Sequence, residues 1–87
     1  MQFSENIINH SAYSIYLQFM EPFEINVLAQ SYTIQPLISD NFEVYQADEL
    51  IGFLTPTVRK EGTLWSSREI EKDRAQQIGE SIEKHRL

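Results

Sequence analysis

The residues of this 87-residue chain that could do acid/base or metal chemistry are scattered carboxylates and two histidines. Asp48 and Glu49 are adjacent, but neighbouring residues of a strand point to opposite faces, which is the wrong arrangement for an acid/base pair. They are better explained as turn acids. His10 and His85 lie near opposite ends, and neither has a carboxylate at metal-ligand spacing. We therefore expect no catalytic residue, no metal site and no cofactor, and interpret the protein as a non-enzyme.

Charge is distributed unevenly along the chain. Residues 1–58 contain seven Asp or Glu and no Lys or Arg, a formal charge of −7, and all seven bases lie between Arg59 and Arg86. A segment of that sign repels phosphate groups, so we expect neither nucleic acid nor a membrane surface as a partner. Six of the acids form a candidate surface for a basic protein partner: Glu21, Glu24, Asp40, Glu43, Asp48 and Glu49.

Length and composition indicate a single domain over residues 1–87, because two hydrophobic cores would each be too small to fold unaided. The chain has no cysteine, so neither a disulfide nor a thiolate metal site can supplement the core. Residues 1–5 hold no base, and no apolar run has the length of a signal peptide or of a membrane span. We expect a cytoplasmic location.

Alternation of apolar and polar residues predicts an antiparallel sheet of four to five short strands, mostly in meander order. The strand-like segments are residues 13–19, 23–27, 32–34, 42–45, 50–54 and 63–65. Residues 13–19 also fit helical spacing, but their β-branched and aromatic content favours a strand. Pro36 places its strand at an edge or ends it, Ala47 and Asp48 form a hairpin turn, and residues 55–57 close the return strand. Gly52 suggests a bulge or a close contact with another element.

The carboxyl-terminal segment is predicted to be a helix that packs on one face of this sheet. Ser66 and Glu69 have the spacing of a capping box, and a start nearer Ile70 is the alternative. The expected apolar stripe consists of Ala75, Ile78, Gly79 and Ile82. Glycine is costly inside a helix, so Gly79 indicates a close approach to the sheet. Trp65 is expected in the core beneath the helix.

Part of this pattern resembles one found in small uncharacterised bacterial α+β proteins. The resemblance rests on residues 48–52, on Thr55-Pro56, on Leu64-Trp65 and on residues 76–85 (QQIGESIEKH). These motifs are structural: a hairpin, a tryptophan strand and a docking helix. The resemblance implies a shared scaffold and no particular activity.

Two functions fit these features. The first is a non-enzymatic protein-interaction module, which would self-associate or bind another protein through the sheet or a strand edge. Its motivation is the aromatic content of the amino-terminal half, which exceeds what one helix stripe can cover. The second is an acidic inhibitor or immunity-type protein that occupies the basic channel of a nuclease or a similar enzyme. A salt-sensitive association with a basic protein would favour the second, and salt-insensitive self-association would favour the first.

Overall fold

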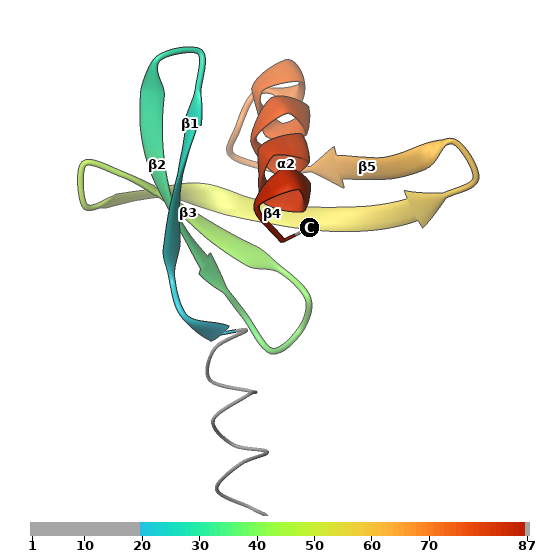
Figure 1. Cartoon of the computed structure of the whole chain (residues 1–87), viewed down its shortest axis with the longest axis horizontal. Coiled ribbons are helices and arrows are strands. Elements are labelled where there is room, and N and C mark those ends of the chain that lie inside the picture. The colour runs from blue at the N-terminus through green and yellow to red at the C-terminus, as the bar shows by residue number, and fades with distance from the viewer. Residues whose placement is uncertain (1–19, 87) are drawn as a thin grey trace, which may run out of the picture.

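The structure is a computed structural model that describes residues 20–86. In chain order its elements are β1 (Phe23–Val27), β2 (Gln30–Pro36), β3 (Phe42–Gln46), β4 (Glu49–Arg59), β5 (Gly62–Ser66) and α2 (Lys72–Arg86). The strands form one antiparallel meander in the order β1-β2-β3-β4-β5, and α2 packs on the sheet (Figure 1). The predicted α+β class is confirmed. The segment 13–19, predicted as a strand, lies outside the described residues.

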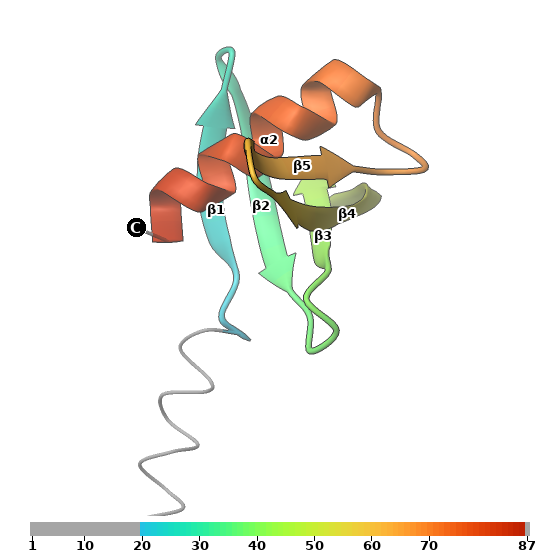
Figure 2. The same cartoon turned by 90° about the vertical axis from the view of Figure 1, so that its right-hand side faces the viewer.

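The sheet is curled, and α2 bridges its two edge strands. The helix contacts β1 at one edge of the sheet and β5 at the other, as well as β4. In Figure 1 it lies between the β1–β2 hairpin and the β4–β5 hairpin, and Figure 2 shows it running across the strands. The concave inner face of the sheet is therefore covered by the helix. Within residues 20–86 there is no helix with the length and hydropathy needed to cross a bilayer.

The inner face of the sheet and the facing stripe of α2 make up the core. Its buried apolar residues are Ile25, Tyr32, Ile34, Phe42, Val44, Leu54, Trp65, Ile70, Ala75, Ile78 and Ile82. Ala75, Ile78, Gly79 and Ile82 are all buried, which confirms the predicted helix stripe. The hydroxyl of buried Tyr32 accepts a hydrogen bond from Arg74 Nη1 at 3.2 Å, so even this polar atom is paired.

Gly79 allows α2 to lie directly on Trp65. A Cβ atom at Gly79 would overlap the indole ring, so a side chain is excluded there. Trp65 is only 4% exposed and also packs against Phe42, with ring centroids 5.5 Å apart. Its Nε1 has no hydrogen-bond partner among residues 20–86, so packing rather than polar pairing holds the ring. The predicted close approach and the predicted core position of Trp65 are confirmed.

The predicted helix start at Ser66 is wrong. The first helical turn is capped by Glu71, whose carboxylate accepts the backbone N–H groups of Asp73 and Arg74, each at 3.3 Å. Ser67 stabilises a separate turn upstream, because its hydroxyl accepts the N–H groups of Glu69 and Ile70. The alternative start near Ile70 is closer to the observed one, at Lys72.

β4 is longer than predicted because it changes partner half-way along. Its residues 49–54 pair with β3 and its residues 55–59 pair with β5, so the predicted end at residues 55–57 is wrong. Pro56 lies opposite Trp65, whose N–H points away from β4 and donates to Gln76. Such a pair exchanges no ladder bond, so proline removes none. Pro36 does end its strand, as predicted.

The predicted hairpin of β3 and β4 is confirmed, and its turn is more strained than its sequence suggests. Ala47 and Asp48 both have positive φ, 52° and 67°, as the two central residues of a type I′ turn require. The β1–β2 hairpin uses Leu28 and Ala29 in the same way, at 52° and 68°. Neither turn contains the glycine that adopts positive φ without cost.

Gly52 fulfils both of its predicted roles. The register between β3 and β4 shifts here, because Val44 pairs with Gly52 while Tyr45 pairs with Leu50, which leaves Ile51 as the extra residue of a bulge. A Cβ atom on Gly52 would also come within 2.9 Å of the Cβ atom of Glu69. The glycine therefore lets the segment before α2 lie against β4.

Candidate protein-binding surface

The convex outer face of the sheet is formed by the strand residues that point away from α2. Two cross-strand rows cross it, Glu24-Thr33-Tyr45-Leu50 and Gln35-Glu43-Phe53. Residues directly opposite each other in a sheet share a face, so each row presents its side chains on the same side. The carbonyl oxygen of Met20 accepts a hydrogen bond from Gln35 Nε2 at 2.8 Å, which ties the start of the described chain to this face.

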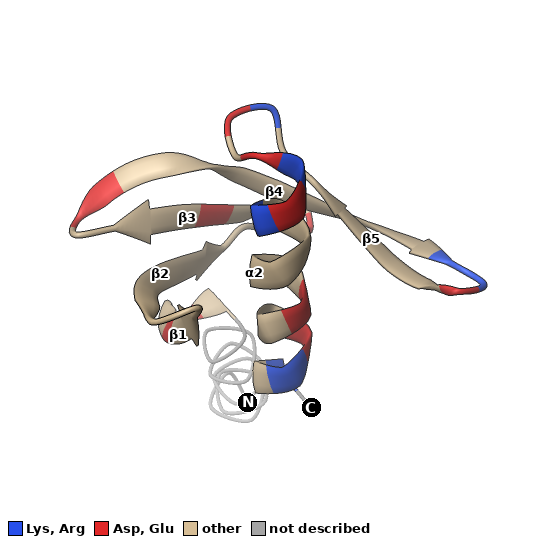
Figure 3. Cartoon of the chain, turned by 90° about the horizontal axis from the view of Figure 1, so that it is seen from above, with Lys and Arg blue, Asp and Glu red and all other residues tan. Residues whose placement is uncertain are grey.

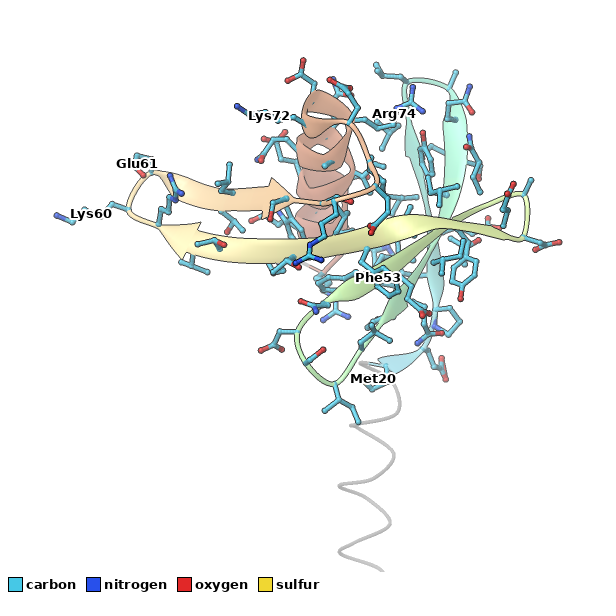
Figure 4. The ribbon with its side chains drawn as sticks, turned by 180° about the vertical axis from the view of Figure 1, so that it is seen from behind. Met20, Phe53, Lys60, Glu61, Lys72 and Arg74 are labelled. Atoms are coloured by element: carbon cyan, nitrogen blue, oxygen red, sulfur yellow. The ribbon has the colours of Figure 1, made fainter. Side chains whose placement is uncertain are left out.

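The bulge in β4 creates an apolar centre on this face. Residues three apart in a regular strand point to opposite sides, but the extra residue Ile51 places Leu50 and Phe53 on the same side, beside Tyr45 and Glu43. Leu50 is 42% exposed and Phe53 is 39% exposed. Figure 4 shows Phe53 on the side of β4 away from α2. We call Tyr45, Leu50 and Phe53 the outer apolar patch.

A hydrogen bond fixes one side chain of the outer apolar patch. The phenol of Tyr45 donates to the Glu43 carboxylate at 3.0 Å. This bond raises the pKa of Tyr45 above its ordinary value of 10.0, and burial and the negative charge of Glu43 act in the same direction. Tyr45 is therefore a neutral hydrogen-bond donor at physiological pH, held beside a carboxylate that remains partly accessible.

A hollow adjoins the outer apolar patch. It has a volume of about 490 Å³ and is lined by Phe53, Thr55, Ser66, Ser67, Arg68 and Glu69. Glu69 closes one side of it, because its carboxylate accepts the backbone N–H of Phe53 at 3.1 Å. Phe53 thus lies between the outer apolar patch and a polar depression.

The six acids predicted to bind a partner divide among three parts of the sheet. Glu24 and Glu43 lie on the outer face, Asp48 and Glu49 lie at the β3–β4 turn, and Glu21 and Asp40 lie at the opposite end of the sheet. Glu43 borders the outer apolar patch, because it lies opposite Phe53. Thr33 separates Glu24 from Tyr45, and Asp48 and Glu49 lie at the turn that precedes Leu50. Asp40 instead lines a groove on the inner side, together with Phe42 and Trp65.

The signs of charge are segregated in space as well as in sequence. Among the described residues, Lys and Arg occur on the β4–β5 hairpin tip, in the segment before α2 and on α2, whereas β1 to β3 carry acids alone (Figure 3). The outer face over these strands consequently has a negative potential with little internal compensation.

Sequence reasoning pointed to the acids and missed the apolar residues between them. Leu50 and Phe53 look like members of opposite faces until the bulge is known, and Gly52 was its one signal. His85 lies in the last turn of α2 and stacks on Phe23, with ring centroids 4.0 Å apart and planes 3° from parallel. Within residues 20–86, no three His, Asp or Glu side chains are grouped as ligands of a metal ion.

This surface combines exposed apolar area, one hydrogen-bonded phenol and neighbouring carboxylates. Comparison of the chain with protein-family models, with curated proteins and with solved structures finds no match. The resemblance to small bacterial α+β proteins stays a prediction.

Proposed function

We propose that this domain is a non-enzymatic protein-interaction module whose outer face binds a basic partner protein. The observation that carries the proposal is the pair of exposed side chains Leu50 and Phe53, brought together on one face by the bulge. Exposed apolar groups rimmed by polar ones are typical of protein contacts, where aromatic residues act as anchors.

The chemistry of the partner follows from the charges around the outer apolar patch. Glu43 borders it, Glu24 lies further along the same face, Asp48 and Glu49 lie at the adjoining turn, and no Lys or Arg is found in residues 20–58. A complementary surface has an apolar centre ringed by Lys or Arg, because opposite potentials speed association and like charges suppress it. A symmetric contact of this face with a second copy of itself is disfavoured, because the two-fold axis would place acids opposite acids.

The experiment uses the full chain immobilised in four forms: wild type, Phe53→Ala, the double variant Glu43→Lys/Asp48→Lys, and the control Val58→Ser. Val58 is 83% exposed and lies in the half of β4 that pairs with β5, so the control tests for non-specific apolar capture. Proteins from an extract of the source organism are captured on each form and identified. We expect a basic protein that binds wild type and Val58→Ser but neither of the outer-face variants.

Association with that protein, once purified, should depend on salt. The Debye length falls from about 10 Å at 0.1 M salt to roughly 4 Å at 0.5 M, so the wild-type association rate should drop several-fold and that of the charge-reversed variant much less. Equal capture by wild type and Phe53→Ala would contradict the proposal. Self-association at low and high salt that Phe53→Ala abolishes would replace the basic partner by a second copy of this chain.

A further inference from the structure

The edge of β5 that faces α2 has no neighbouring strand among the described residues, and its backbone groups are hydrogen-bonded to the side chain of Gln76. The backbone N–H of Trp65 donates to Gln76 Oε1 at 2.9 Å, and Gln76 Nε2 donates to the carbonyl oxygen of Thr63 at 3.1 Å. In an antiparallel strand, the N–H and C=O of one residue point to the same edge. Thr63 and Trp65 therefore direct their backbone groups toward α2, while Leu64 directs its own toward β4.

The side-chain amide of Gln76 occupies the positions of two peptide groups of an added strand. In such a strand, the residue opposite Leu64 would be flanked by a carbonyl that accepts from Trp65 and by an N–H that donates to Thr63. The single amide of Gln76 supplies one acceptor and one donor at these places. It is held there by a further bond from its Nε2 atom to Glu80 Oε2 at 3.1 Å.

Two cavities flank Gln76 along this edge, and both include Leu64 and Gln76 in their walls. One has a volume of about 380 Å³ and extends past Thr63 toward the tip of the β4–β5 hairpin. The other has a volume of about 440 Å³ and extends past Trp65 to Ser67, before α2. Together they form a trough between β5 and α2 that runs along the strand and is divided by the side chain of Gln76.

The walls of the trough specify which side chains an added strand would carry. The cavity beside Thr63 is lined by three carboxylates, Glu61, Glu80 and Glu83, and by a single base, Arg59. The cavity beside Trp65 is lined by Leu64 and Trp65, together with Lys72 and Asp73, whose charges are opposite. Alternate residues of a strand point to one face, so the two cavities receive side chains two positions apart, one basic and one apolar.

We propose that β5 binds an extended peptide of a partner protein as a sixth, antiparallel strand in this trough, with Gln76 as the displaceable stand-in. Because the added strand runs against β5, the residue opposite Trp65 comes first, and the peptide reads apolar-x-basic. Main-chain bonds to an open strand edge supply affinity in this mode of recognition, and the alternate side chains supply specificity. The site is separate from the outer apolar patch and does not rest on the function proposed above.

A library of random heptapeptides displayed on phage is the first probe, selected on the full chain. Selected peptides should share the apolar-x-basic pattern. The tightest is then made with a fluorescein label, and its affinity is measured by anisotropy against wild type, Gln76→Ala and the double variant Glu80→Lys/Glu83→Lys. Gln76→Ala removes the competing amide and should tighten binding by roughly five- to thirtyfold, as expected for one or two hydrogen bonds of about 1 kcal/mol each. The charge reversal should weaken it.

Two matched comparisons test whether the peptide pairs as a strand. Thr63→Pro removes a backbone N–H from the trough edge without touching the ladder to β4, so it should abolish binding while Thr63→Ala retains it. On wild-type protein, an N-methyl group on a peptide amide that faces β5 should abolish binding, and one on the next amide should not. The second comparison does not depend on the folding of any variant.

Three results would overturn the proposal. One is a selection that enriches no binding peptide. Another is equal binding by Thr63→Pro and Thr63→Ala, or equal binding of the two N-methyl peptides. The third is loss of binding in Phe53→Ala with Gln76→Ala unchanged, which would place the peptide on the outer apolar patch.

Discussion

The two faces of this sheet are built from the same strands and have opposite properties. On the inner face, Ile34, Val44 and Leu54 are fully buried under α2, whereas the outer face exposes Leu50 and Phe53 among carboxylates. Leu54 and Phe53 are adjacent in the chain, and their side chains point to opposite faces because successive residues of a strand alternate. Stability is thus concentrated on one face, which leaves the other open to selection for binding.

The largest expected effect is on stability, and it should differ between substitutions at Leu54 and at Phe53. Leu54→Ala should lower the free energy of unfolding by about 2–5 kcal/mol, because it removes buried methyl groups and leaves a cavity. Phe53→Ala should cost less than about 1 kcal/mol, since the ring is partly in water. Urea unfolding followed by Trp65 fluorescence measures both, and comparable losses would show that the outer face also contributes to the core.

A second comparison concerns the contact between the inner face and α2. Gly79→Ala should destabilise the domain by about 1–3 kcal/mol through overpacking against Trp65, although alanine is favoured over glycine in a helix by about 1 kcal/mol. Gln77→Ala, at an exposed position of the same helix, is the control and should change little. Thermal unfolding is the measurement. A Gly79→Ala variant at least as stable as wild type would show that α2 does not lie in close contact with Trp65 at this position.

The smallest expected effect is on the titration of Tyr45, on the outer face. The Glu43 carboxylate raises the pKa of Tyr45, so the folded state holds the phenol proton more tightly than the unfolded state does. The stabilisation is present below pH 10 and is lost as the pH rises through the higher folded value. Glu43→Gln should move this titration to lower pH, as read from tyrosinate absorbance with Tyr45→Phe as the reference. An unchanged titration would show that the hydrogen bond does not persist in solution.

Local patterns predicted most of the inner face. Alternation located the described strands, and glycine on an apolar helix stripe indicated the contact between Gly79 and Trp65. The helix start was mispredicted because glutamate is an uncommon cap, and Glu71 was less evident than the two serines before it. The length of β4 was mispredicted because Pro56 breaks a strand only where a ladder bond is needed, which depends on the partner strand.

The two proposed binding surfaces were harder to predict because they depend on contacts across strands. The six acids could be identified from the sequence, but their division among three parts of the sheet depends on how the strands pair, which the sequence does not show. The pairing of Leu50 with Phe53 needed the bulge at Ile51, which Gly52 only hinted at. The trough at β5 was not predicted at all, because nothing local distinguishes Gln76 from other polar residues of a solvated helix face.

The position of α2 in the chain has a consequence for biosynthesis. Among residues 20–86, all five strands precede α2, and α2 covers the face that holds Leu54 and Trp65. A chain grows from its amino terminus, so the ribosome releases the apolar side of the sheet before it has made the cover. Until residues 72–86 emerge, the nascent sheet is a candidate client of chaperones that hold exposed apolar surface, and docking of α2 ends that dependence.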